Sequence, residues 1–183
     1  MKFAEALQRA MRATGIALLL GLAACAGMPE NMSAPALPTA VSVPAGHRHE
    51  LTLKAVGTLN YECRPVPGMS GAYAWTLDAP DASLLHWSGF PVGRYYAGPT
   101  LALRDGSRIV TSVVAASPDD PGKLPIQLLQ TVSASGEGEL ADVTYVQRLN
   151  AVAAAPSAGC GPNQIGTSRR VQFGADFLFY KRR

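Results

Sequence analysis

Histidines are the side chains of this chain best suited to proton transfer or metal binding, and there are three of them, His47, His49 and His86. Alternate residues of an extended chain point the same way, so His47 and His49 have the spacing of a metal-binding pair. A solvated loop explains the same pair, and His86 beside Trp87 fits a packed or surface histidine. We therefore predict no metal site.

Catalytic motifs are the next feature that would indicate chemistry. The sequence contains no Gly-x-Ser-x-Gly elbow, no His-Glu-x-x-His, no phosphate-binding loop and no Gly-x-Gly-x-x-Gly. The carboxylates lie far apart along the chain, and a glycosidase pair would need a fold that brings two of them together. We assign no catalytic residue and expect no cofactor; these carboxylates are Glu62, Asp78, Asp105, Asp142 and Asp176.

Aromatic residues and one arginine are the candidates for ligand binding. Tyr95, Tyr96 and Trp75 supply flat faces that stack on a sugar or another planar ligand, or that pack in a core. Arg148 lies in a mostly apolar run, so it must either extend its charge to solvent or pair with a carboxylate. Structural pairing and ligand binding both remain open for it.

The first 24 residues have the order of a secretory signal peptide. Lys2, Arg9 and Arg12 precede a ten-residue apolar stretch, GIALLLGLAA, at 15–24. A membrane-spanning helix needs about 20 apolar residues, so this stretch is too short to be one. A buried amphipathic helix is the alternative.

Leu22-Ala23-Ala24-Cys25 resembles the bacterial lipobox. In signals of that kind the cysteine thiol receives a diacylglycerol, the peptidase cuts before it, and the new amine is acylated. Two or more acyl chains anchor a protein firmly, at about 0.8 kcal/mol for each buried CH₂. The resemblance implies lipidation of Cys25, with Ala26 rather than Asp favouring the outer membrane; an ordinary cleavage site is the alternative.

A proline-rich segment follows the lipidation site. Pro29, Pro35, Pro38 and Pro44 lie between Cys25 and Glu50. Prolines at this density favour extended chain, at about 3.1 Å per residue. We expect residues 25–50 to be a tether and residues 51–183 to form a β-rich globular domain.

The domain shows the two-residue alternation of half-buried strands. Alternating runs occur at 51–63, 73–77 and 171–179, and further strands are predicted at 101–104, 108–114, 126–132 and 143–149. The second run should stop at Asp78-Ala79-Pro80, Gly57 should mark a bulge or bend, and Asp105-Gly106 fits a type I′ hairpin turn. The pattern predicts an all-β fold, an antiparallel β-sandwich or a partly closed barrel.

Two cysteines remain besides Cys25. Cys63 and Cys160 would share an oxidising compartment if the chain is exported, and one disulfide is the simplest outcome. Two free buried thiols are the alternative. Neither cysteine has a histidine neighbour or a Cys-x-x-Cys spacing, which argues against zinc.

A series of short motifs connects the chain to a known family. Tyr96-Ala97-Gly98-Pro99-Thr100 followed by Asp105-Gly106-Ser107 is its most specific part. With the motifs around it, from Ala55 to Tyr180, the chain resembles the secreted bacterial and fungal family catalogued as domain of unknown function three-four-five-five. The family usually has His, Trp and Gly-Gly where this chain has Tyr95, Leu101 and Ala153-Ala154. The family implies no activity.

The net charge of the chain argues against nucleic-acid binding. The 183 residues carry a formal net charge of +3, and the first 14 contribute +2 of it, which leaves 13 basic against 12 acidic residues in the rest. A nucleic-acid partner needs a basic field, so we expect none.

The sequence favours a non-enzymatic envelope lipoprotein that is held to the membrane by lipid and binds a small-molecule or glycan ligand or a protein partner. A small hydrolytic or cell-wall-modifying enzyme and a purely structural envelope module are the alternatives.

Overall fold

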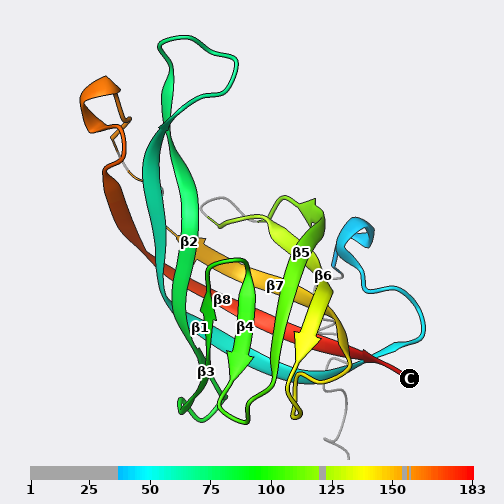
Figure 1. The fold of residues 1–183 in the computed structure, drawn as a ribbon. Helices are drawn as coiled ribbons and strands as arrows, with labels where there is room; N and C mark the ends of the chain where they lie inside the picture. Colours follow the sequence, from blue (N-terminus) through cyan, green and yellow to red (C-terminus); the bar gives the residue numbers. More distant parts are fainter. Residues whose placement is uncertain (1–36, 120–122, 154–155, 157) are drawn as a thin grey trace, which may run out of the picture. The chain divides into compact units, whose positions relative to one another are not determined.

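Eight antiparallel strands form one sheet that closes into a ring in the described part of the chain (Figure 1). The structure is a computed structural model that describes residues 37–119, 123–153, 156 and 158–183. The predicted signal peptide and Cys25 lie outside these residues. The strands are β1 (His47–Pro65), β2 (Tyr73–Leu85), β3 (Pro91–Tyr96), β4 (Thr100–Leu103), β5 (Arg108–Ser117), β6 (Ile126–Ser135), β7 (Val143–Ala153) and β8 (Ser168–Arg182).

The topology is the simplest that a closed antiparallel sheet can have. Each strand pairs with the next along the chain, and β8 pairs with β1. The predicted all-β antiparallel class is confirmed, and its barrel alternative is the one observed. Two three-residue 3₁₀ helices, η1 (Thr39–Val41) and η2 (Pro162–Gln164), complete the described elements. In this part of the chain no helix has the length and hydrophobicity of a membrane span.

Alternation along the strands fills the barrel interior with apolar side chains. In β8 the predicted positions Phe173, Ala175, Phe177 and Phe179 are all buried. Gly57 of β1 stays in register with Ala82, so the predicted bulge is not there; the register shifts at Asn60 and Tyr61 instead. A Cβ at Gly57 would overlap the backbone of β2, so this glycine permits close approach of the two strands.

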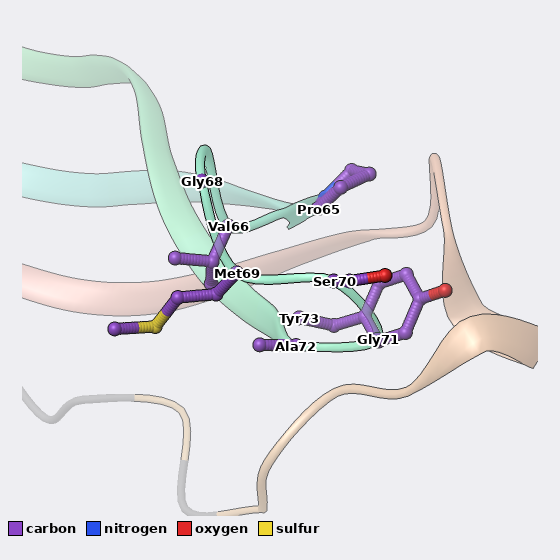
Figure 2. Close-up of a pocket in the computed structure, with 8 residues that line it drawn as sticks. All are labelled: Pro65, Val66, Gly68, Met69, Ser70, Gly71, Ala72 and Tyr73. Carbon is purple, nitrogen blue, oxygen red and sulfur yellow. The ribbon is translucent and has the colours of Figure 1, made fainter.

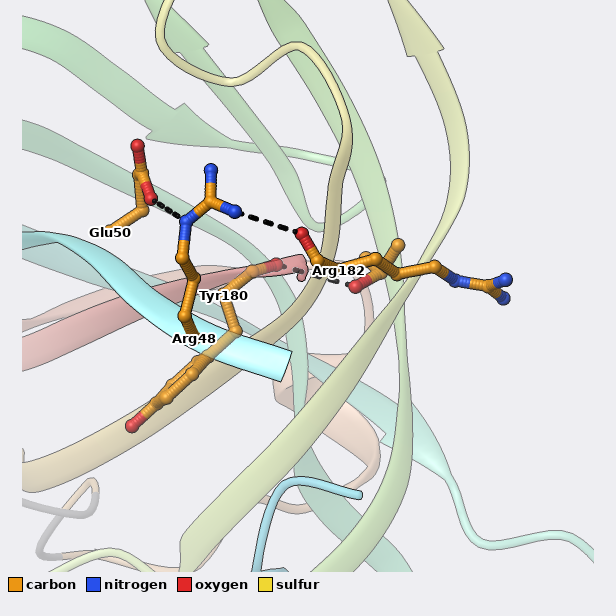
Figure 3. A network of polar contacts seen from close by, with 5 residues as sticks. Arg48, Glu50, Tyr180 and Arg182 are labelled. Atoms are coloured by element: carbon orange, nitrogen blue, oxygen red, sulfur yellow. Dashed lines mark hydrogen bonds and ion pairs between the residues drawn. The ribbon is translucent and has the colours of Figure 1, made fainter. Parts of the chain in front are cut away.

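The barrel closes along the β1–β8 seam. Near the start of β1, Arg48 donates from Nε to the Glu50 carboxylate at 2.9 Å and from Nη1 to the carbonyl oxygen of Arg182 at 3.2 Å (Figure 3). Thr144 of β7 donates to the carbonyl oxygen of Tyr180 at 3.3 Å. The backbone near the end of β8 is therefore held from both neighbouring strands, while the side chains of Arg182 and Arg183 are exposed.

β2 does not stop at Asp78-Ala79-Pro80, as the sequence predicted, but continues to Leu85. β3 pairs only with residues 82–85 of β2, so Pro80 lies where β2 has a neighbour on one side alone, β1. An open edge is the place in a sheet that tolerates a residue without a backbone N–H.

Three strands extend beyond the others and form what we call the arm: residues 60–65 of β1, 73–79 of β2 and 168–172 of β8. β7 pairs with β8 from Phe173 onward, so among the described residues no fourth strand joins this part of the sheet. Figure 1 shows the β1–β2 hairpin rising above the barrel. The disulfide and the loop that carries Cys160 lie at the arm.

The N-terminal segment packs on the outside of the barrel. Val41 of η1 is fully buried against Ile126 and Leu128, which face outward from β6. The compact unit begins at Leu37 and β1 begins at His47, so the domain starts well before the predicted boundary at 50/51. An apolar pair on an outer sheet face needs a cover, and residues 37–46 of the expected tether provide it.

The predicted hairpin at Asp105-Gly106 is present, but the turn is not type I′. Gly106 has φ +95°, whereas Asp105 is not among the residues with positive φ. The turn runs from Leu103 to Gly106, with the Gly106 N–H donating to the Leu103 carbonyl oxygen. Asp105 accepts from Ser107 Oγ at 2.6 Å and from the Glu139 N–H at 2.7 Å, so it joins this turn to the β6–β7 loop.

Candidate functional site

Arg148 lies inside the barrel wall, which neither of its sequence-based explanations predicted. The residue is 8 % exposed, so its charge does not reach solvent. Its Nη2 donates to the carbonyl oxygen of Pro125 at 3.2 Å, and its Nε is buried without a hydrogen-bond partner. No carboxylate of the described residues lies within ion-pair distance of it. The guanidinium is thus a buried cation whose hydrogen-bonding capacity is partly unused.

Tyr95 meets Arg148 from β3. Its ring packs against Phe177, with centroids 5.0 Å apart, and against Phe173 at 6.2 Å. Burial raises the pKa of the Tyr95 hydroxyl, and the nearby charge of Arg148 opposes this shift. The core-packing explanation therefore holds for most of the ring, while the hydroxyl end faces the cation.

Tyr61 of β1 completes this group, which we call the mouth: Arg148, Tyr95 and Tyr61. Burial lowers the pKa of Arg148, and the electrostatic influence of Tyr95 and Tyr61 partly offsets that. The positive charge of Arg148 therefore lies near two tyrosine side chains and has no carboxylate partner among the described residues.

The arm continues the same face beyond the mouth. Tyr61 pairs across the sheet with Leu77 and with Arg169, and Cys63, two residues on, pairs with Trp75. Cross-strand partners share a face, so Tyr61, Cys63, Trp75 and Leu77 lie on one face of the arm, which meets the barrel at the register shift between Asn60 and Tyr61. Leu77 is half-exposed on it.

Trp75 is already engaged by its surroundings. The indole N–H donates to the carbonyl oxygen of Ala158 at 2.8 Å, and the Arg169 guanidinium lies 5.0 Å from the ring centroid. Such a cation–π pair contributes about 0.5–1 kcal/mol at an exposed site. Trp75 therefore holds the loop segment 158–167 and Arg169 in place on the arm.

The four predicted ligand-binding residues separate into three positions. Tyr95 and Arg148 meet in the mouth, and Trp75 lies farther along the same face. Tyr96 follows Tyr95 on β3, and its side chain points to the opposite face of the sheet, so it does not join them. Tyr61 and Arg169 were not predicted. The alternation of β1 gave a signal for Tyr61 as an inward residue, but none for its proximity to Arg148.

The predicted disulfide is confirmed. Cys63 and Cys160 are bonded, with their Cα atoms 5.9 Å apart. The loop is further joined to β1 by the Cys63 N–H, which donates to the Thr167 carbonyl oxygen at 3.0 Å. The predicted lipidation site, Cys25, lies outside the described residues.

The histidines are engaged individually. His47 Nδ1 lies 2.9 Å from the Pro44 carbonyl oxygen, and His49 Nε2 lies 2.8 Å from Thr52 Oγ1. His86 Nδ1 lies 3.2 Å from Ser88 Oγ. Within the ranges that the structure describes, no three His, Cys, Asp or Glu side chains gather in a way that could hold a metal ion.

A depression of about 430 Å³ lies at the tip of the β1–β2 hairpin (Figure 2). Its lining comes from this one hairpin and includes Met69, Ser70 and Tyr73 but no charged side chain. Binding sites commonly combine an apolar lining with a few convergent polar groups from different elements. Arg148, Tyr95 and Tyr61 come from three strands, β7, β3 and β1, whereas the depression is lined by one hairpin alone.

Comparison with protein families places the chain. Residues 86–181, more than half of the sequence, match the family described as protein of unknown function, DUF3455. The chain belongs to the DUF3455 family. The DUF3455 match includes Tyr95 and Arg148 of the mouth, while Tyr61 and the β1–β2 hairpin precede it. No curated protein and no solved structure matches the chain.

Proposed function

We propose that this DUF3455 protein is an exported lipoprotein whose β domain binds a ligand without transforming it. Its signal sequence directs it out of the cytoplasm, and acyl chains on Cys25 hold it at the outer membrane. The barrel then acts as a binding module in the envelope.

Export is supported by the cross-link. Disulfides persist in oxidising compartments and are rare in the cytosol. The Cys63–Cys160 bond joins residues 97 positions apart in a domain that begins shortly after the predicted cleavage site. The order of positive charge, apolar stretch and cysteine at the N-terminus supports the same route.

The mouth is the observation that carries the binding function. Native structures satisfy most of their buried polar atoms, and an unsatisfied one requires an explanation. Arg148 Nε is such an atom and belongs to a permanently charged group. The tyrosine rings near Arg148, and the half-exposed Leu77 that pairs with Tyr61 across the sheet, supply apolar surface for a bound molecule.

The binding function is tested by thermal unfolding of the full chain carrying Cys25→Ser, which avoids detergent. Glycans and cell-wall fragments are added at millimolar concentration, and a true ligand raises the melting temperature because it binds only the folded state. Tyr61→Ala should remove the rise. Trp87→Ala, which truncates an aromatic residue that is 87 % exposed in the β2–β3 turn, is the matched control and should keep it. The absence of any shift would contradict small-molecule binding.

The anchor has its own test. The unaltered chain should sediment with outer membranes after fractionation, and Cys25→Ser should release it into the soluble fraction. Mass spectrometry of the unaltered protein should show an acylated cysteine at its N-terminus. An unacylated protein that begins at Met1 would show that the export proposal is wrong.

A further inference from the structure

We infer that the ligand of the mouth carries a carboxylate group, which Arg148 binds, on an apolar or aromatic body. This inference rests on the proposed binding function and names the chemistry of its ligand. Nothing in the DUF3455 match assigns such a site.

The unpaired positive charge of Arg148 indicates that the ligand of the mouth is an anion. A guanidinium that is taken out of water loses its hydration, and proteins normally compensate with a paired carboxylate. Arg148 has no carboxylate partner among the described residues, and its hydrogen bonds go to the Pro125 carbonyl oxygen and the Tyr95 side chain. An anionic ligand would supply the missing partner.

The geometry favours a two-point acceptor. Nε and Nη2 share one edge of the guanidinium, and carboxylates bind such an edge through two parallel hydrogen bonds. Nη2 is held by a 3.2 Å bond to the Pro125 carbonyl oxygen, and Nε is unoccupied. A carboxylate that displaces the Pro125 carbonyl would use both positions at once.

The number of charges distinguishes a carboxylate from a phosphate. The mouth holds one buried cation, and Arg169, the next on the same face, already lies over the Trp75 ring. A carboxylate brings one negative charge, whereas a phosphate monoester carries nearly two at neutral pH. The second charge would lie near Tyr61 and Tyr95 without a cationic partner. The same two rings suit an aromatic or aliphatic body.

The side-chain N–H of Arg148 provides a direct measurement. In the ¹H–¹⁵N spectrum of the full chain with Cys25→Ser, the Nε–H signal of Arg148 is identified by its loss in Arg148→Gln. Sodium benzoate, phenyl phosphate and benzyl alcohol are titrated separately at constant ionic strength. Benzoate should move this signal in a saturable way, with an affinity at least tenfold above that of phenyl phosphate, and benzyl alcohol should leave it unchanged.

Two variants complete the experiment. Arg148→Gln should weaken benzoate binding at least tenfold, measured from the remaining amide signals. Arg108→Gln, an exposed arginine whose Nε donates to Ser135, is the matched control and should bind benzoate as before. Equal binding by the Arg148→Gln variant, tighter binding of phenyl phosphate, or an Nε–H signal that benzoate does not move would each overturn the inference.

The outcomes also separate this inference from the proposed function. A glycan that stabilises the unaltered chain and the Arg148→Gln variant equally would leave the binding function in place and show that the carboxylate assignment is wrong. Loss of both the glycan response and the benzoate response would contradict the two together.

Discussion

Gln147 and Arg148 are neighbours on β7, and both are buried, but they face opposite sides of the barrel wall. On the outer face, Gln147 donates to the Val41 carbonyl oxygen at 2.7 Å and accepts from the Tyr180 hydroxyl at 2.6 Å. On the inner face, Arg148 donates to the Pro125 carbonyl oxygen at 3.2 Å and hydrogen-bonds the Tyr95 side chain, but its buried Nε has no partner.

The difference indicates what each polar group is for. Gln147 is satisfied by its own chain, and the segment from Leu37 to Gly46 covers it, so it fastens that segment to the barrel. Arg148 costs free energy that the folded chain alone does not recover. Local conflicts of this kind concentrate at functional sites, because binding supplies what the fold leaves out.

Removal of the Cys63–Cys160 disulfide should lower the free energy of unfolding more than any other change. It also tests whether the arm can open locally while residues 37–46 stay folded on the outer face of the barrel. The double variant Cys63→Ser, Cys160→Ser opens a loop of about 98 residues, which corresponds to about 4–5 kcal/mol of unfolding free energy in the chain-entropy model. Urea denaturation measures the loss. Hydrogen exchange should rise first in the arm and the loop segment 158–167, while the amides of 37–46 stay protected near native conditions. Uniform exchange across both regions would contradict this separation.

Gln147→Ala should remove the hydrogen bonds that hold the 37–46 segment to the outer face of the barrel. The variant leaves the Val41 carbonyl oxygen and the Tyr180 hydroxyl without their buried partner, at a cost of about 2–3 kcal/mol. Gln130→Ala, the same truncation at an exposed position of β6, is the control and should change the free energy of unfolding by under about 0.5 kcal/mol. Equal costs for the two variants would show that the outer hydrogen bonds do not hold the segment.

Arg148→Met should raise the free energy of unfolding, whereas Gln147→Ala lowers it. It replaces an unpaired buried charge by an apolar side chain of similar length, so the ligand-free protein should gain about 1–2 kcal/mol in unfolding free energy. Arg94→Met, which removes an exposed arginine paired with Asp81, should change it by under about 1 kcal/mol. Chemical denaturation at neutral pH compares the three proteins. A destabilised Arg148→Met variant would show that the guanidinium is a structural support.

Asp105 is a charged residue whose carboxylate is hydrogen-bonded, in contrast to the unpaired Nε of Arg148. Its substitution should change stability least. Burial raises the pKa of Asp105, but hydrogen bonds from Ser107 and from the Glu139 N–H outweigh it, so the pKa lies below its ordinary value of 3.8. The ionised carboxylate therefore stabilises the fold fully above pH 4, and this contribution disappears as the pH falls through the folded-state pKa.

Asp105→Asn should thus lower the melting temperature slightly at pH 6 and much less at pH 2. The effect stays below that of Arg148→Met because the carboxylate is exposed and water screens it. Glu137→Gln in the neighbouring loop is the control. A melting-temperature difference that grows toward low pH would reverse the sign of the argument.

Much of the fold was predictable from local pattern. The alternation of β1 and β8 identified the inward residues because a strand exposes successive side chains to opposite faces. The end of β2 was predicted wrongly, because whether a proline interrupts a strand depends on whether β3 lies beside it. The start of the domain was also placed too late: Pro38 and Pro44 have the composition of a tether, but the outward-facing Ile126 and Leu128 need the cover that Val41 provides.

The candidate site was predictable only as residue types. Arg148 and Tyr95 are conspicuous in the sequence, yet their separation of more than fifty residues gives no sign that they meet. Tyr96 was as plausible as Tyr95 until the strand direction assigned them to opposite faces. Tyr61 entered only because the closed sheet brings β1, β3 and β7 around one interior.

The sequence alone determined the alternation that forms strands and the expected pairing of Cys63 with Cys160. It also determined the order of positive charge, apolar stretch and cysteine in the first 25 residues. Each of these depends only on neighbouring residues or on the number of cysteines. Ring closure, the cover over Gln147 and the isolation of the Arg148 charge were decided by tertiary structure. Burial and the presence of a counter-charge belong to the space around a side chain, and segments distant in the chain define that space.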